Sequence, residues 1–294
     1  MKYLTTIDTV SLQIDTYDEV ARNLITDGIL HLMHTKNLYV KEKSYPINLH
    51  ANFFMREYEV YAFNVILVSI RMGSFSMQNP LNNIVTTTYY IAIEFAGLKT
   101  YHEPLDTISN NTLLSVCAYL NSRNIFYKLT GLDICIDLQT KFENVLALCT
   151  KRSPKTSYYT ANETQRYKTT HYIEKILDKN EDEVLQRAYL YDKTAKENLP
   201  YALARFELKL QQKFFNKYRN TLMYSIFKTL DKYHVMYVPV KKERQYLREQ
   251  YDNYPILRDR DIKRIGFDSY RRYFDMTVIN SIIVRIFSIK EQNQ

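Results

Sequence analysis

Three short segments of the sequence, residues 131–137, 188–193 and 204–209, carry side chains that could act on a phosphate. In each of them polar and apolar residues alternate, which predicts a strand with one polar and one apolar face. The polar positions are Asp133, Cys135 and Asp137 in the first segment, Tyr189, Tyr191 and Lys193 in the second, and Arg205, Glu207 and Lys209 in the third. Carboxylates, tyrosines and bases on one face are typical of a metal-assisted site with a tyrosine nucleophile.

Tyr191 is the candidate nucleophile, with Lys193 as its helper. Tyrosine is a weak nucleophile unless its pKa is lowered or a metal ion activates the phosphate that it attacks. Lys193 follows Tyr191 by two residues, and so falls on the same face of the predicted strand. We therefore expect both residues to be catalytic.

The candidate metal ligands are Asp133, Glu207 and Asp137. Mg²⁺ or Mn²⁺ is usually held by one or two carboxylates, together with water and substrate oxygens. Asp133 and Asp137 would lie about 13 Å apart along one strand, too far to share an ion, whereas adjacent strands are only ~4.8 Å apart. We favour Asp133 paired with Glu207 from a neighbouring strand, with Asp137 in a supporting role or at the strand end.

Each of these residues also has an ordinary explanation. Asp137 could end a strand and cap a following helix, and Tyr191 could be a strand aromatic. Arg205 and Glu207 could form a solvated pair, which contributes little to stability. Because these residues fall on one face of three predicted strands, the ordinary explanations would have to hold for all three strands at once, which would require three coincidences.

The elements that position these residues predict an α+β fold. We expect a mostly antiparallel sheet with helices on one face and an open polar catalytic face, followed by a basic, largely helical C-terminal region. The expected domains are a catalytic domain over 1–212 and a DNA-binding region over 213–294. The patterns predict strands over 7–14, 57–69, 84–95, 131–137 and 201–210, a hairpin of 170–176 with 187–193 around an acidic tip at 178–183, and helices over 17–35, 111–122, 141–150 and 214–233.

Composition excludes several classes of protein. Of the 294 residues, 46% are hydrophobic, which indicates a globular chain. The five glycines lie too far apart for a phosphate-binding loop, so we expect neither a Walker-type ATPase nor a dinucleotide-binding fold. Three cysteines without a CxxC pair, and no apolar run near the ~18 residues that cross a bilayer, predict a cytoplasmic protein with no membrane contact.

The net charge of +8 is concentrated in the last third of the chain. From Arg205 onward there are 19 Lys and Arg against 10 Asp and Glu, while the preceding part is nearly neutral. Such a segment favours a polyanion partner, although a helix face balanced by nearby aspartates is the alternative. We expect Arg205 and Lys209 on the sheet to contact DNA. The residues that we expect to contact duplex phosphates are Arg260, Lys263, Arg264, Arg271 and Arg272.

The order of the three segments resembles a known family. Leu-Asp-Ile-Cys-Ile-Asp over 132–137, Tyr-Leu-Tyr-Asp-Lys over 189–193 and Arg-Phe-Glu-Leu-Lys-Leu over 205–210 are similar to motifs of the Rep_trans family of rolling-circle replication initiators. Residues 7–12 resemble the family's opening strand, so the likeness spans about residues 5–235. The hairpin before Tyr191 lacks the glycine-containing turn usual in the family, and a basic residue is missing at Leu132.

The resemblance implies metal-dependent nicking and joining of origin DNA. Tyr191 would attack the scissile phosphate and form a 5′-phosphotyrosyl link, leaving a 3′-hydroxyl that primes synthesis. Asp133 and Glu207 would match the family's acids for Mg²⁺ or Mn²⁺, and Lys193 and Arg205 would contact phosphate. The implied partners are duplex origin DNA and the single strand at the nick, with a host helicase and a second copy of the chain as further candidates.

Three alternatives remain open at this point. The chain could be a non-catalytic DNA-binding protein on the same fold, a conjugative relaxase of the same family, or a nuclease that uses the same acids without a covalent step. The nicking class that binds metal through a His-hydrophobic-His pair is disfavoured, because His31 and His34 are three residues apart in a helical pattern. A tyrosine recombinase is also disfavoured, because the segment Tyr270 to Tyr273 is the only weak hint of one in the sequence.

Overall fold

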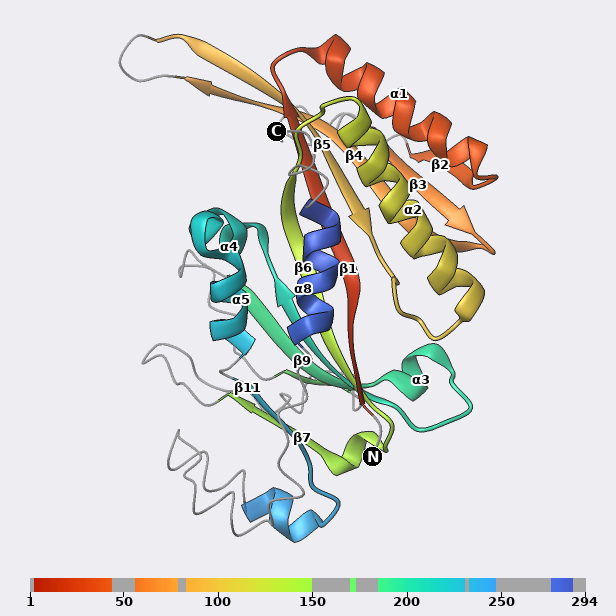
Figure 1. The fold of residues 1–294 in the computed structure, drawn as a ribbon, viewed down its shortest axis with the longest axis vertical. Helices are drawn as coiled ribbons and strands as arrows, with labels where there is room; N and C mark the ends of the chain where they lie inside the picture. Colours follow the sequence, from red (N-terminus) through yellow and green to blue (C-terminus); the bar gives the residue numbers. More distant parts are fainter. Residues whose placement is uncertain are drawn as a thin grey trace. The chain divides into compact units, whose positions relative to one another are not determined.

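The protein has an α+β fold with a large antiparallel sheet, as the sequence predicts (Figure 1). The computed structural model describes residues 3–43, 56–78, 83–149, 170–172, 185–230, 233–246 and 276–287. Tertiary contacts divide the chain into two compact units: unit 1 comprises Met1–Ile7 and Asp133–Ile282, and unit 2 comprises Asp8–Leu132 and Ile283–Gln294. The long strands β1 (Tyr3–Thr16) and β6 (Lys128–Leu138) contribute residues to both.

Unit 2 is a sheet covered by two helices. Its strand order is β2-β3-β4-β5-β1-β6, with β2 (Tyr39–Lys43), β3 (Arg56–Ala62), β4 (Val65–Gln78) and β5 (Val85–Phe95) paired in antiparallel fashion. Helices α1 (Glu19–Thr35) and α2 (Glu103–Ser122) lie over one face (Figure 1). Alternate residues of β1, such as Val10, Leu12 and Ile14, are buried because period-two alternation directs them to one face. Asp18 caps the start of α1, because its side chain accepts a hydrogen bond from the Val20 backbone N–H.

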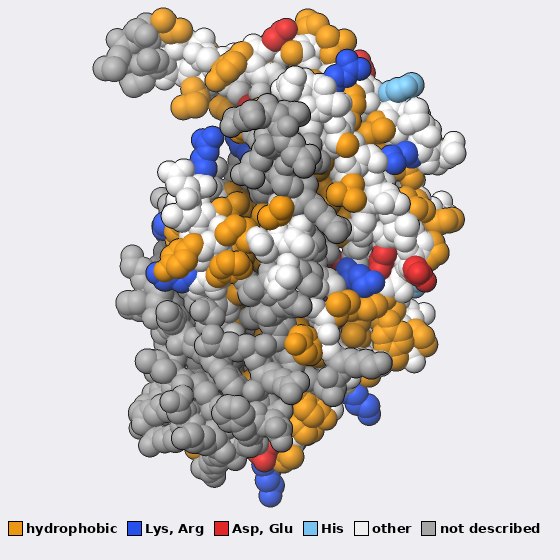
Figure 2. Space-filling view, viewed as in Figure 1, with side chains coloured by type: hydrophobic (Ala, Val, Ile, Leu, Met, Phe, Trp, Pro, Cys, Tyr) orange, Lys and Arg blue, Asp and Glu red, His pale blue; other side chains and the backbone are white. Residues whose placement is uncertain are grey.

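The outer part of the β4–β5 hairpin exposes apolar side chains. Gly73 lies opposite Tyr90, whose ring occupies the space that a side chain at Gly73 would fill. Figure 2 shows hydrophobic side chains along this hairpin at the upper left. The large exposed ones are Phe75, Met77, Ile84 and Val85.

Unit 1 places the three chemistry-bearing segments on adjacent strands. Its strand order is β1-β6-β10-β9-β8, with β8 (Thr170–Tyr172), β9 (Gln186–Asp192) and β10 (Ala204–Leu210). A two-stranded sheet pairs β7 (Val145–Cys149) with β11 (Tyr233–Tyr237), and Tyr233 packs against Phe206 on the apolar face of β10 at 5.4 Å between ring centroids. The remaining elements are the 3-10 turns Phe142–Asn144 and Arg219–Thr221, and the helices α3 (Lys193–Glu197), α4 (Gln212–Lys217), α5 (Leu222–Leu230), 241–246 and α8 (Met276–Phe287).

Several predicted elements are wrong in type or extent. The helix predicted over 141–150 is a short 3-10 turn followed by β7, because pairing with β11 overrides the helical preference of its leucines and alanine. The single strand predicted over 57–69 is the β3–β4 hairpin, and β2 was not predicted. The helix predicted over 214–233 is two short helices, a 3-10 turn and the start of β11, while α2 begins eight residues earlier than expected.

Some predictions lie outside the described residues. These are the acidic tip at 178–183 and the basic residues Arg260, Lys263, Arg264, Arg271 and Arg272. The predicted boundary at residue 212 stays a prediction. Across the described part of the chain, every helix is too short or too polar to cross a membrane.

Candidate active site

The register of β9 with β10 gathers polar side chains of both strands on one face. Tyr191 lies opposite Arg205, and Tyr189 lies opposite Glu207. Directly opposed residues of an antiparallel pair point to the same side, and every second residue repeats that direction. The same face therefore also carries Lys209, opposite Arg187.

Strand β6 supplies the acids on the other side of β10. Asp137 pairs with Arg205, and Asp133 pairs with Lys209. Because the partner numbers fall as the β6 numbers rise, the two strands run antiparallel. Cys135, between the two acids on β6, is fully buried.

Tyr191 donates a hydrogen bond to Glu207. Its hydroxyl lies 2.9 Å from Glu207 Oε2. The two residues are diagonal neighbours across β9 and β10, within reach for a long side chain. Tyr191 is only 7% exposed and Glu207 is also buried, so the polar face is less open than the sequence suggests. The predicted nucleophile is therefore held against one of the predicted metal-binding acids.

The positive charge of Lys209 offsets the negative charge of Asp133 and Glu207, the two carboxylates that we expect to hold a metal ion. Its Nζ lies 3.0 Å from Asp133 Oδ2, and the lysine is partly exposed. Burial alone would lower the pKa of Lys209, but attraction to Asp133, a hydrogen bond to it and the charge of Glu207 together raise that pKa above its ordinary value. Lys209 is thus firmly cationic at neutral pH, as a phosphate contact should be.

The raised pKa of Lys209 predicts a loss of stability at high pH. Its contribution should be complete below the ordinary lysine pKa of 10.5 and should disappear as the pH rises through the higher folded-state value. We expect wild type to be more stable than Lys209→Met at about pH 7, with a difference that shrinks as the pH rises above 10.5. Urea unfolding at a series of pH values measures this difference, and a constant difference across the range would contradict the ion pair.

Arg205 and Asp137 form a buried ion pair rather than a binding surface. Arg205 Nε and Nη2 lie 2.5 and 2.7 Å from the two oxygens of Asp137, and both side chains are 0% exposed. Thr6 adds a hydroxyl bond to Asp137. In this arrangement neither side chain is placed to meet phosphate or a metal ion. We therefore assign to the pair the role of holding β6 against β10.

The structure corrects the position of Lys193. Strand β9 ends at Asp192, whose side chain caps α3, and Lys193 is the first residue of that helix. Lys193 is 1% exposed, and its Nζ bonds Glu197 at 2.9 Å. Lys193 therefore does not share the face of β9 that carries Tyr191, because the strand ends one residue before it.

Another lysine, which sequence reasoning missed, contacts the tyrosine. Lys196 Nζ lies 4.9 Å from the centroid of the Tyr191 ring, a cation–π distance. Lys196 is exposed. The capping signal of Asp192 could have revealed the turn that brings Lys196 back over Tyr191. Tyr189 and Arg187 are also on this face, and burial raises the pKa of Tyr189.

The donor set on this face suits a hard divalent cation. Asp133 and Glu207 come from adjacent regions of β6 and β10 and both act on Lys209. No group of three or more His, Cys, Asp or Glu side chains able to hold a metal occurs among the residues that the structure describes. Two carboxylates are enough for Mg²⁺ or Mn²⁺ when a substrate phosphate and water complete the shell. The Mg²⁺ or Mn²⁺ ion therefore stays a prediction, with which Asp133 and Glu207 are compatible.

Comparison with known proteins gives a distant likeness among solved structures. No protein-family profile and no curated protein matches the chain. Among solved structures, the chain is similar to a rolling circle replication initiator protein from Geobacillus stearothermophilus, with 10% identity and a TM-score of 0.39 over 87% of this chain and 98% of that one. These values assign neither a family nor an activity.

Proposed function

We propose that the chain nicks and rejoins DNA through a covalent tyrosine intermediate, as a rolling-circle replication initiator does. The observation that carries the proposal is the hydrogen bond from Tyr191 to Glu207, on a face that also holds the Asp133–Lys209 pair. A hydroxyl that can lose its proton to a neighbouring carboxylate, next to fixed positive charge, has the properties of an activated nucleophile for phosphate.

In the proposed step, Tyr191 Oη attacks the phosphorus of a DNA phosphodiester. Its proton passes to Glu207, which acts as general base. The bond from phosphorus to the 3′-oxygen breaks, the 3′-oxygen takes up a proton from water, and a 5′-phosphotyrosyl link remains. Rejoining is the reverse attack of a 3′-hydroxyl on that link. One phosphoester replaces another, so the exchange needs no nucleoside triphosphate, in agreement with the absence of a glycine-rich phosphate loop from the sequence.

The other residues of the face have distinct proposed roles. Asp133 and the oxygen of Glu207 that does not face Tyr191 would hold Mg²⁺ or Mn²⁺, which when bound neutralises charge on the phosphate and activates it. Lys196, which lies over the Tyr191 ring, and Lys209 on β10 would supply positive charge to the DNA phosphates. DNA would approach along Lys209, Tyr189 and Arg187, which are less deeply buried than Tyr191.

The remaining proposals concern partners. We propose that the C-terminal basic residues contact duplex origin DNA through phosphates. We also propose that unwinding is supplied by a separate helicase, and that a second copy of the chain is a candidate partner at the origin.

The proposal predicts a covalent adduct that depends on metal. Purified protein is mixed with supercoiled and single-stranded DNA of its own genetic element, with Mg²⁺ or Mn²⁺ or with EDTA, and run on denaturing gels. We expect nicked DNA and a protein–DNA adduct with metal and neither with EDTA, because the carboxylates alone repel the phosphate. Mass spectrometry of the digested adduct should place the nucleotide on the peptide that contains Tyr191.

Each alternative gives a different result. Metal-dependent cleavage without an adduct would indicate a hydrolytic nuclease. Tight origin binding without cleavage would indicate a DNA-binding protein on this fold. A conjugative relaxase would form the same adduct, and is distinguished by transfer rather than copying of the nicked strand.

A further inference from the structure

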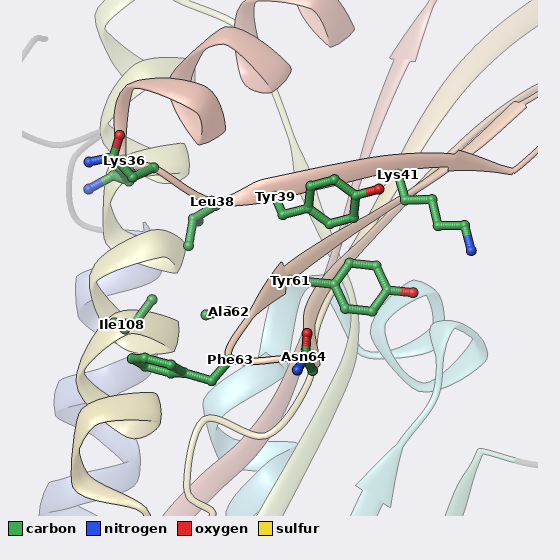
Figure 3. A pocket seen from close by; sticks show the side chains of 10 residues that line it. Lys36, Leu38, Tyr39, Lys41, Tyr61, Ala62, Phe63, Asn64 and Ile108 are labelled. Atoms are coloured by element: carbon green, nitrogen blue, oxygen red, sulfur yellow. The ribbon is translucent and has the colours of Figure 1, made fainter.

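A second candidate binding surface, lined by aromatic side chains and lysines, lies within unit 2. A pocket of about 550 Å³ forms at the β2 edge of its sheet, between the end of α1, β2, the β3–β4 turn and α2 (Figure 3). Its lining includes three aromatic side chains and two lysines, namely Tyr39, Tyr61, Phe63, Lys36 and Lys41, and no carboxylate. None of these residues belongs to the candidate active site around Tyr191.

Phe63 is exposed in a backbone conformation that does not favour it. Ala62 pairs with Val65, so Phe63 and Asn64 form a two-residue hairpin turn, and both have positive φ, at 49° and 63°. Such turns prefer Asn, Asp or Gly, because a left-handed conformation crowds a larger side chain. Phe63 is nevertheless 70% exposed and therefore gains little from burial. An aromatic kept at a strained, solvent-facing position favours a binding role over a structural one.

The two tyrosines form a second aromatic element of the pocket. Tyr39 and Tyr61 are cross-strand partners on β2 and β3, with ring centroids 6.0 Å apart (Figure 3). The Tyr61 hydroxyl donates to Glu59, which fixes that ring. Tyr39 is 66% exposed, so one of the two rings offers a free face to a planar partner.

The charge of the pocket is positive because the neighbouring acids already have partners. Glu59 is bound by Lys43 and Tyr61. The other acids of β2 and β3 pair as Glu42 with Arg56 and Glu57 with Arg71. Among the described residues, neither Lys36 nor Lys41 forms an ion pair, so both are available to an anion.

We propose that this pocket binds unpaired bases of single-stranded DNA. Tyr39 and Phe63 stack on bases, while Lys36 and Lys41 contact the phosphates, a combination that single-strand binding proteins use. A duplex would not fit, because its bases already stack on one another. The choice of DNA rests on the proposed nicking function, which exposes a single strand at the nick.

Anisotropy of a fluorescent oligothymidine tests the proposal, with full-length protein in EDTA so that no cleavage occurs. A length of about 12 nucleotides suits a site of this kind. Phe63→Asn should weaken binding about 5- to 150-fold by removing one stacking ring. Asparagine suits the turn, so this variant should remain folded. Tyr39→Phe keeps an aromatic ring and should bind like wild type. Lys41→Gln should reduce the slope of log binding constant against log salt concentration by about 0.7, because it removes one phosphate contact.

Matched controls separate this site from other contacts. Tyr17→Asn removes an aromatic that is 83% exposed outside the pocket, and should leave binding unchanged. Wild-type affinity for oligothymidine in Phe63→Asn, or an equal loss of affinity for duplex of the same length in that variant, would overturn the proposal. Tighter binding of an RNA oligomer would overturn the assignment to DNA. Tyr191→Phe should retain this binding, so the nicking activity and the single-strand site can fail independently.

Discussion

Replacing Arg205 with methionine is expected to lower the free energy of unfolding by about 3–5 kcal/mol. The change leaves the carboxylate of Asp137 buried without its cation, and Asp137 has no exposed side-chain surface through which water could compensate. The hydroxyl of Thr6 remains as its contact on β1, at the long distance of 3.4 Å. Urea unfolding followed by circular dichroism measures the loss.

A double variant distinguishes the ion pair from the packing around it. Arg205→Met with Asp137→Leu removes both charges, and apolar replacement of a buried pair is often neutral or stabilising. We therefore expect the double variant to be more stable than Arg205→Met alone. Lys128→Met is the control, because it breaks the exposed cross-strand pair of Lys128 with Asp15 at 2.6 Å and should cost about 0–1 kcal/mol. Equal losses for Arg205→Met and Lys128→Met would contradict the assignment.

The strand faces could be predicted from the sequence because alternation is local information. The polar faces of β9 and β10 follow from residues two apart, and the register confirms that Tyr191, Glu207 and Lys209 share a face. The partners across β6 and β10 could not be predicted in this way. Register between strands some 70 residues apart depends on the whole sheet, and Asp133 forms its ion pair with Lys209.

The errors arose where a local pattern ended or tertiary pairing prevailed. The alternation of β9 predicts a strand through Lys193, but Asp192 is a good N-cap and a helix begins at Lys193. The β3–β4 turn was missed because Phe63-Asn64 is not a usual turn sequence. That same departure from preference lies at the edge of the pocket, and an unfavourable local choice often marks a functional position.

Replacing Tyr191 with phenylalanine is expected to reduce adduct formation by at least about 1,000-fold, because the nucleophilic oxygen is removed. The fold should lose only about 1–3 kcal/mol, the cost of leaving Glu207 without the donated hydrogen bond. Adduct yield on denaturing gels, at equal protein folded by circular dichroism, measures the effect.

Tyr189→Phe is the matched control for this experiment. Tyr189 lies two residues away on the same strand and face, opposite Glu207, but the nearby groups that act on it include Arg187 and Lys209. Burial raises the pKa of its hydroxyl, which makes Tyr189 harder to deprotonate and a poorer nucleophile. Tyr189→Phe should therefore keep most of the adduct. If Tyr189→Phe abolished the adduct and Tyr191→Phe kept it, the nucleophile would be Tyr189, and the hydrogen bond between Tyr191 and Glu207 would be structural.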